Sequence, residues 1–311
     1  MASGSPVSSP SPPARRNVHR RRPARNTRSG YVLLAPLIVL ILLVTIFPAV
    51  YAYYMSANHV LLSNIDQRHF VGLGNYADEL HDGRFWQSIL FSVFFTLVAT
   101  SVEFGLGLAL ALLFGVIHRG RGLAISFLLL PMMVAPALFG IMYRLLLNDF
   151  VGILTYYLSL IHVSTDTLTG TNQIVPLVMV IDVLQWTPFV FIILFTALQS
   201  VPQDILEAAR ADGASAWRTL LAIRLPYILP ALVVVLLIRG VDAFKSFDMI
   251  YVLTGGGPGT LTTTVSIYIY QLAFNTGDLG HANAAAVLLL VLLTPLLAVT
   301  LRYIIRDQGK K

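Results

Sequence analysis

Six long apolar stretches dominate this chain and constrain its fold more than any other feature. They cover approximately residues 31–55, 85–116, 123–147, 174–199, 227–253 and 282–305. A tilted helix needs about 20 apolar residues to cross the roughly 30 Å hydrocarbon core of a bilayer, and each stretch approaches or exceeds that length. A transmembrane barrel would instead show segments of about ten residues with alternating polarity, and runs such as Val287–Leu293 do not alternate. The sequence therefore predicts an all-α integral membrane protein with six transmembrane helices.

The composition agrees with this prediction. Of the 311 residues, 56% are hydrophobic and 12% are charged, which is about half the charged share of a soluble domain. The absence of cysteine excludes a disulfide scaffold, a thiolate metal site and a cysteine nucleophile. The net charge of +6 could suggest a nucleic-acid partner, but seven arginines lie between Arg15 and Arg28, so the excess is local and we expect no such partner.

Basic residues set the expected orientation. Sixteen of the 21 lysines and arginines fall in the amino-terminal tail, the second and fourth loops and the carboxyl-terminal tail. The loops of the opposite side contain only Arg68 and Arg84. The positive-inside rule therefore predicts a multi-pass protein of the cytoplasmic membrane, with both termini in the cytoplasm.

Residues 1–28 are rich in Pro, Ser and Arg and have almost nothing to bury, so we expect a disordered basic tail. A basic segment before an apolar run also resembles a secretory signal. The run from Tyr31 to about Met55 is long enough to span a bilayer, and no small-residue cleavage site follows it, which favours a retained first helix. Residues 29–306 then form the transmembrane domain, and 307–311 a second cytoplasmic tail.

The fourth loop, residues 201–226, is unusual for a connection between membrane helices. It is rich in Ala and other helix-forming residues, is entered through Pro202, and has Asp204 placed to cap its first turn. Gly213 interrupts this pattern, so we expect two short helices with a kink at the glycine. One interpretation is an amphipathic helix on the membrane surface. The other is a docking element for a cytoplasmic partner, since an Ala/Gly surface allows close approach.

The fifth apolar stretch contains ionisable residues that alternate in sign every three residues, namely Arg239, Asp242, Lys245 and Asp248. Unpaired charges at this depth cost at least ~2.5 kcal/mol each, so they need partners or water. They could form a self-neutralising ladder on one helix, or a polar patch that lines a translocation cavity. Glu103 in the second stretch is expected to form a structural ion pair, with Arg144 or with another subunit.

The fourth apolar stretch adds Asp182, Gln185 and Trp186 just before the sequence Thr187-Pro188-Phe189. Proline removes a backbone hydrogen bond, so we expect Pro188 to break this helix and free carbonyl groups. Free carbonyls beside an aromatic face suit a polyol, whose hydroxyls need polar partners and whose C–H faces need a flat apolar surface.

At this point the sequence resembles a known family, the membrane subunits of bacterial ABC importers. Their cytoplasmic EAA loop is matched by Glu207-Ala208-Ala209, Asp212-Gly213-Ala214 and Ile223-Arg224-Leu225-Pro226. Two further segments, Val71–Tyr76 and Phe247–Pro258, resemble carbohydrate-type importers such as the maltose, trehalose and glycerol-phosphate systems. The resemblance covers residues 31–306 and implies the six-helix fold of type I ABC importer permeases, with residues 201–226 as the coupling loop.

The resemblance also implies partners. This subunit would pair with a second, related permease, and an extracytoplasmic solute-binding protein would deliver the solute. Its coupling loop would lie in a cleft of a cytoplasmic ATPase dimer, through Glu207, Ala208, Ala209, Asp212 and Gly213. The chain has no Gly-rich phosphate loop of the G-x-x-x-x-G-K-[ST] type, so we expect ATP and Mg on the ATPase subunits, and no cofactor, metal or enzymatic activity here.

In maltose-type relatives the solute site is formed by the fourth and fifth helices, and matching on Pro188 and Pro258 transfers it to this chain. The implied solute-binding residues are Asp182, Gln185, Trp186, Phe189, Arg239, Asp242, Ala243 and Ser246. The relatives have mainly neutral amides, serine and aromatic residues there. Arg239 and Asp242 depart from that pattern, which argues against maltose itself, and Arg239 could meet an anionic group or neutralise Asp242.

Two alternatives remain open at the level of sequence. An importer for a peptide, phosphonate or amino acid is less consistent with the segment before the second helix. A stand-alone secondary transporter could use the intramembrane charges as a relay, but this class often contains inverted repeats, and the two halves of the chain show no convincing similarity.

Overall fold

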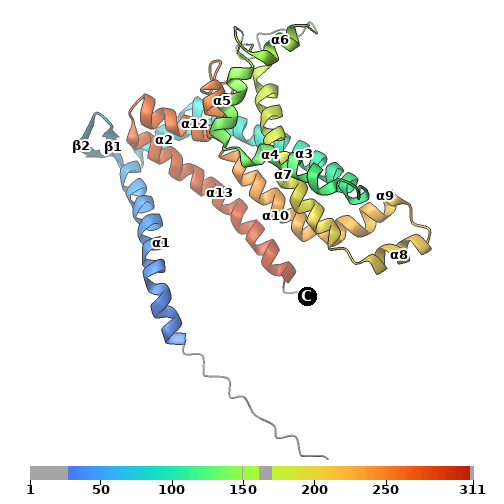
Figure 1. The fold of residues 1–311 in the computed structure, drawn as a ribbon. Helices are drawn as coiled ribbons and strands as arrows, with labels where there is room; N and C mark the ends of the chain where they lie inside the picture. The colour runs from blue at the N-terminus through green and yellow to red at the C-terminus, as the bar shows by residue number, and fades with distance from the viewer. Residues whose placement is uncertain (1–26, 149, 161–169, 309–311) are drawn as a thin grey trace, which may run out of the picture. The chain divides into compact units, whose positions relative to one another are not determined.

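The computed structural model describes residues 27–148, 150–160 and 170–308, which are predominantly helical (Figure 1). The predicted tails, residues 1–28 and 307–311, lie largely outside the described residues. The chain divides into two compact units, Met1–Val50 and Tyr51–Lys311. The first helix, α1 (Thr27–Ser56), crosses that division, and its part from Leu34 to Ser56 has a mean hydropathy of 2.6.

Several helices are apolar enough to cross a membrane. Four stretches of the described residues qualify by length and composition: Leu34–Ser56, Gly83–Val116 (α3), Ile174–Gln199 (α7) and Ala216–Thr254. A fifth is added if the bent pair α4 (Arg121–Met133) and α5 (Pro136–Leu146) is one span. Helix α13 (Leu279–Gln308) contains a shorter apolar part, Leu279–Pro295, which is not counted among these spans. The described spans thus number four or five, against the six expected.

The third apolar stretch is not the single helix expected over residues 123–147. It forms α4 and α5, which meet at an angle of 91°. Val134 and Ala135 between them have extended backbone, with ψ of 132° and 137°. Pro136 explains the break, because its ring disfavours helical backbone at the preceding residue while suiting the first position of the next helix.

Pro188 does not break α7, so that expectation was wrong. The helix continues from Ile174 to Gln199 with Pro188 buried inside it. Proline removes one hydrogen bond, to the carbonyl of Leu184, and packing of the flanking turns can offset that loss. The flanking residues Val190 and Phe191 are buried. Pro188 therefore leaves the Leu184 carbonyl without its helical hydrogen bond, but it does not break the helix.

The fifth apolar stretch belongs to a longer helical run. Helix α9 (Ala216–Thr219) continues through a π-helical turn, η1 (Leu220–Arg224), into α10 (Leu225–Phe244). A short break at Lys245–Phe247 precedes α11 (Asp248–Thr254). Upstream lies α8 (Gln203–Ala211), so two short helices flank Gly213 as the sequence predicted. Pro202 is the N-cap residue of α8, and no side chain caps it.

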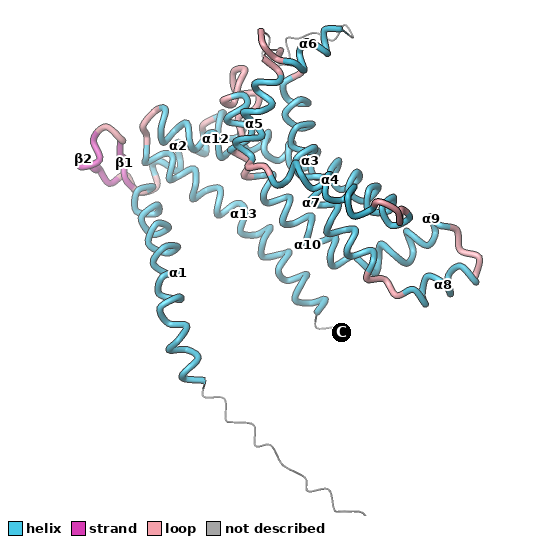
Figure 2. The backbone as a smooth tube through the Cα atoms, viewed as in Figure 1, coloured by secondary structure: helices cyan, strands magenta, loops and turns pink. Residues whose placement is uncertain are grey.

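The shorter elements include a hairpin that the sequence did not predict (Figure 2). Strands β1 (Asn58–Leu61) and β2 (Asn64–Phe70) pair antiparallel, with Asn58 opposite Phe70. The remaining short helices are α2 (Gly74–His81), α6 (Ile153–Leu160), α12 (Val265–Tyr270) and η2 (Gln271–Asn275). Helix α13 packs against α2 and β1.

The core is organised around α3 and α7, which pack along each other and both contact α10. Gly107 allows their close approach, since a Cβ there would lie 2.9 Å from Val190 Cγ1 and 3.1 Å from the Phe191 nitrogen. One apolar cluster includes Phe95 and Ala243, and a second includes Phe114 and Val235. Between these two clusters lie two buried charged residues, Glu103 on α3 and Arg239 on α10.

Candidate functional site

A single buried arginine connects three helices. Arg239 of α10 donates from Nε to Glu103 Oε2 at 2.7 Å and from Nη2 to Glu103 Oε1 at 2.8 Å. Nη2 also donates to Asp182 Oδ2 of α7. The side chains of Arg239, Glu103 and Asp182 are at most 2% exposed. The Arg239 cluster, defined as these three residues, therefore links α3, α7 and α10 inside the predicted membrane region.

The charges of this cluster are not balanced within it, because two carboxylates face one guanidinium. A buried ion pair is not by itself a strong source of stability, since desolvation of both charges offsets their attraction. Removing one partner is different, because it leaves a buried charge uncompensated and typically costs about 3–5 kcal/mol. Loss of Arg239 would therefore leave both buried carboxylates uncompensated, whereas loss of one acid leaves the arginine paired with the other.

One edge of the cluster is open. Arg239 Nη1 donates to Asp242 Oδ2 at 3.5 Å, and the side chain of Asp242 is 42% exposed. Lys245 Nζ lies 3.9 Å from Asp242 Oδ1. The Arg239 guanidinium lies over the Trp186 ring at 5.2 Å, a cation–π contact, and Trp186 meets Phe189 edge to face at 6.2 Å. A carboxylate and an aromatic face are thus both held by one buried cation.

These contacts bring together five of the eight predicted solute-site residues: Asp182, Trp186, Phe189, Arg239 and Asp242. The other three lie nearby but have other contacts. Gln185 donates to the Val134 carbonyl at 2.9 Å, where α4 and α5 meet. Ala243 is fully buried in the first apolar cluster, and the Ser246 carbonyl accepts from Thr264 Oγ1 at 2.7 Å. Among the described residues, Gln185 Oε1 and Thr187 Oγ1 are buried without a partner.

Glu103 was not among the predicted site residues. The structural ion pair expected for it is present, but its partner is Arg239 and not Arg144. Arg144 donates instead to the Val252 carbonyl at 3.1 Å. A carboxylate near the middle of an apolar helix usually pairs with a basic side chain, and Arg239 is the basic residue nearest the middle of another apolar stretch. That signal was present in the sequence. The predicted ladder exists only in part, as the pairs Arg239–Asp242 at 3.5 Å and Asp242–Lys245 at 3.9 Å, and Asp248 forms no ion pair among the described residues. The shortest contacts of Arg239 are with other helices.

The predicted coupling residues lie on α8 and the turn after it. Glu207, Ala208 and Asp212 are exposed, whereas Ala209 is buried. Gly213 has φ of +73°, the left-handed region that favours glycine, and a Cβ there would meet nothing within 4 Å. Trp217 of α9 is a large apolar side chain left 68% exposed. The segment presents small residues, charge and one exposed aromatic ring on a turn.

A third polar group lies outside the candidate spans. The Tyr268 hydroxyl is 2.8 Å from Glu79 Oε2 and 2.9 Å from Asp82 Oδ2. A hydroxyl has one hydrogen to donate, so two carboxylates at this distance imply a further proton in the group. Burial raises the pKa of Glu79 above its ordinary value, and burial together with the two carboxylates raises the pKa of Tyr268. No group of three His, Asp or Glu among the described residues is placed to hold a metal ion.

Comparison with known proteins gives concordant matches. The model of the family described as "Binding-protein-dependent transport system inner membrane component" matches residues 34–307. The trehalose/maltose transport system permease protein MalF of Thermococcus litoralis is 37% identical over 269 residues, 86% of this chain and 90% of that protein. The trehalose transport system permease protein SugA of Mycobacterium tuberculosis is 37% identical over 265 residues, 84% of each chain.

A solved structure resembles the fold. A chain of a bacterial ABC transporter involved in the import of the acidic polysaccharide alginate superposes with a TM-score of 0.77. The match covers 90% of this chain and 96% of that chain at 21% identity. At this identity the likeness concerns the fold alone.

Proposed function

The chain belongs to the family of inner membrane components of binding-protein-dependent transport systems, and from this premise we propose that it is the permease subunit of an ATP-driven sugar importer. The fold supports the assignment, since it resembles that of an ABC importer subunit. Two relatives with more than a third of residues identical carry trehalose or maltose in their names. The runner-up is an importer of the same kind for a solute other than a sugar.

The observation that carries the sugar assignment is the open edge of the Arg239 cluster. Trp186 supplies a flat apolar surface, and Asp242 supplies a half-exposed carboxylate that can accept from hydroxyl groups. Arg239 is itself fully buried, so we assign it to the positioning of Trp186 and Asp242 rather than to first contact with solute.

The proposed assembly contains further chains. A second, related permease completes the pathway, an extracytoplasmic binding protein delivers the solute, and a cytoplasmic ATPase dimer binds ATP and Mg. This chain takes the coupling role through the exposed turn around Gly213, with Glu207, Ala208, Ala209 and Asp212 beside it. Its six spans place both termini in the cytoplasm. Cysteines introduced at Asp66 and Arg218 of this cysteine-free chain should therefore react from opposite sides of the membrane.

The continuous helical run explains how the two regions communicate in this proposal. Helices α9, η1 and α10 follow one another without a break from Ala216 to Phe244, and Arg239 lies on the last turns. A displacement of the coupling turn by the ATPase is therefore transmitted to Arg239 and, through its ion pairs, to α3 and α7. The cluster acts in this mechanism as the joint that makes the three helices move together.

The experiment is sugar-stimulated ATP hydrolysis by the complete transporter in vesicles, with its binding protein and a panel that includes trehalose and maltose. We expect one sugar of the panel to stimulate hydrolysis. Asp242→Asn should raise the half-maximal concentration about tenfold or more, since a hydrogen bond to a charged group contributes about 1.5–3 kcal/mol. Asp248→Asn, at the start of α11, is the matched control and should respond normally. Unchanged responses in both variants would exclude Asp242 from the pathway.

The coupling role has its own test. Gly213→Val should disturb the turn, because a β-branched residue rarely adopts positive φ, whereas Gly213→Asn should be tolerated. We expect the valine variant to lose ATPase association and transport while it still inserts into the membrane. Normal transport by Gly213→Val would contradict the role of this turn.

A further inference from the structure

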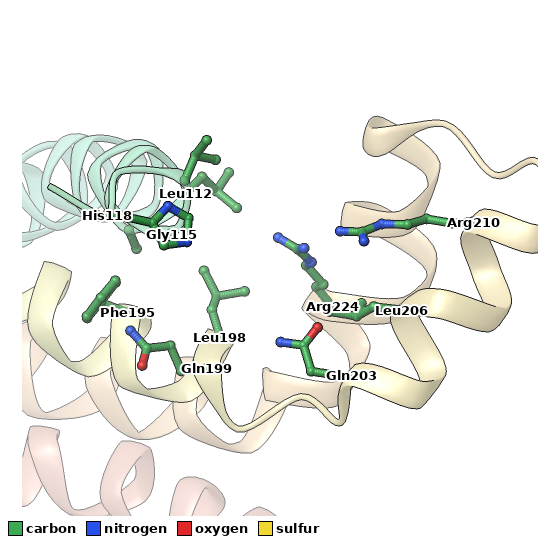
Figure 3. Close-up of a pocket in the computed structure, with 12 residues that line it drawn as sticks. Leu112, Gly115, His118, Phe195, Leu198, Gln199, Gln203, Leu206, Arg210 and Arg224 are labelled. Atoms are coloured by element: carbon green, nitrogen blue, oxygen red, sulfur yellow. The ribbon is translucent and has the colours of Figure 1, made fainter.

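A pocket of about 380 Å³ lies between the ends of α3 and α7, one face of α8 and the last residue of η1 (Figure 3). It is separate from the Arg239 cluster, because the two share no residue. It is also separate from the proposed coupling surface, since Glu207, Ala208 and Gly213 do not line it. None of the functions assigned above explains it.

The polar side of the pocket consists of His118, Gln199, Gln203 and two arginines, and the arginines carry its permanent charge. Figure 3 shows the side chains of Arg210 from α8 and Arg224 from η1 extending into the same space. Neither forms a salt bridge with any described residue, and the Arg224 Nε atom is buried without a hydrogen-bond partner. Two like charges that share a partly enclosed space repel each other unless an anion lies between them. The π-helical turn that carries Arg224 is a feature often found at functional sites.

The opposite side of the pocket is apolar and comes from membrane helices. Leu112, Gly115 and Val116 lie on the last turns of α3, and Leu198 lies on the last turn of α7. Both helices qualify as membrane spans. The two guanidinium groups therefore stand at the level where an apolar span gives way to a polar loop, which is the depth of lipid headgroups.

We propose that this pocket binds the phosphate-bearing headgroup of an anionic phospholipid. The phosphate accepts hydrogen bonds from Arg210 and Arg224, and the proximal acyl carbons pack on Leu112, Val116 and Leu198. A soluble phosphate would match the two arginines but leave the apolar wall without a partner, which is why the lipid is favoured. The proposal is independent of the transported solute.

The test uses the purified transporter complex in detergent, titrated with phosphatidylglycerol or with phosphatidylcholine and observed by native mass spectrometry. We expect a phosphatidylglycerol molecule to be retained in preference to phosphatidylcholine. The double variant Arg210→Gln/Arg224→Gln should bind it about tenfold more weakly or worse, because charge-assisted hydrogen bonds are lost. Arg218→Gln, an exposed arginine of α9 that does not line the pocket, should bind it as the wild type does.

A second variant blocks the pocket without touching its charges. A Cβ at Gly115 would meet nothing within 4 Å, so Gly115→Leu can fold normally while its side chain fills the space. Gly105→Leu is the matched control, since that glycine of α3 is equally open but does not line the pocket. We expect Gly115→Leu to exclude phosphatidylglycerol and Gly105→Leu to retain it.

Three results would overturn the proposal. The first is equal retention of both lipids by the wild type. The second is displacement of phosphatidylglycerol by inorganic phosphate at the same concentration, which would identify a soluble anion as the occupant. The third is loss of the ATPase subunits from the double variant with lipid retention unchanged, which would assign the two arginines to a protein contact.

Discussion

The Arg239 cluster and the pocket around Arg210 and Arg224 present arginine in opposite ways. Arg239 is 2% exposed and has carboxylate partners on its own and two other helices. Arg210 and Arg224 face a pocket and have no carboxylate partner among the described residues. A cation with all its partners inside the chain fixes the positions of helices, whereas a cation without them is free to bind something else. The same side chain therefore serves the fold in one region and a ligand in the other.

The largest expected effect follows from breaking the cluster. Arg239→Met should leave Glu103 and Asp182 as buried carboxylates without a cation and destabilise the protein by about 3–5 kcal/mol. The measurement is the thermal midpoint of the detergent-solubilised complex. Arg210→Gln provides the contrast, because Arg210 is exposed and forms no ion pair with any residue that the structure describes, and it should change stability by no more than about 0.5 kcal/mol.

The replacement of the whole cluster sharpens this prediction. A triple variant with Glu103→Leu, Asp182→Leu and Arg239→Met removes every buried charge at once, and such replacements are often neutral or stabilising. We expect it to recover most of the stability lost by Arg239→Met. Equal destabilisation by both variants would mean that side-chain volume, rather than charge, controls this part of the core.

The charges of both regions are visible in the sequence, but their environments are not. Arg239 and Asp242 stand out because ionisable residues in apolar stretches are rare. The pairing of Glu103 with Arg239 spans 136 residues and depends on how closely α3, α7 and α10 pack. Arg210 and Arg224 are brought together by the turn at Gly213 and the π-helical turn η1. The sequence alone does not predict the direction in which these two turns orient the side chains.

The prolines show the same division, because the sequence predicted a break at Pro188, which does not occur, and none at Pro136, which does. Pro136 follows local sterics, since the preceding Ala135 has extended backbone and α4 has ended. Pro188 has the same local preference but lies inside α7, between turns that are buried against α3, and packing prevails. Local rules therefore predicted helix starts, turns and the apolar segments, whereas tertiary contacts decided which breaks occurred.

A further prediction compares two glycines of α3, Gly107 in the closely packed core and Gly115 at the pocket. Gly107→Ala would place a Cβ 2.9 Å from Val190 Cγ1 and 3.1 Å from a backbone nitrogen, so α3 and α7 must separate slightly. Overpacking of this kind typically costs about 1–3 kcal/mol. Gly115→Ala meets no atom within 4 Å and should stabilise the helix by about 0.5–1 kcal/mol. If the thermal midpoints of Gly107→Ala and Gly115→Ala shift in the same direction, the packing around these two glycines does not differ as the structure indicates.

The smallest effect is expected from the third polar group, in which a proton rather than an arginine relieves the repulsion between acids. Glu79 is buried beside Tyr268, with Asp82 and Asp278 raising its pKa and His281 lowering it, while burial is the largest cause of the rise. A carboxyl whose pKa is raised on folding stabilises the folded protein at low pH, fully below its ordinary pKa of 4.5. That contribution is lost as the pH rises through the folded pKa.

Glu79→Gln isolates this contribution, because the amide stays uncharged and can still hydrogen-bond to Tyr268. The thermal midpoints of wild type and variant should be compared from pH 4.5 to pH 8, so that effects of other groups cancel in the difference. We expect the wild type to lose stability relative to Glu79→Gln as the pH rises. Asp66→Asn on the exposed strand β2 is the control and should follow the wild type throughout. Parallel curves for wild type and Glu79→Gln would mean that folding does not raise the pKa of Glu79, and that the neighbours of its carboxylate offset the effect of burial.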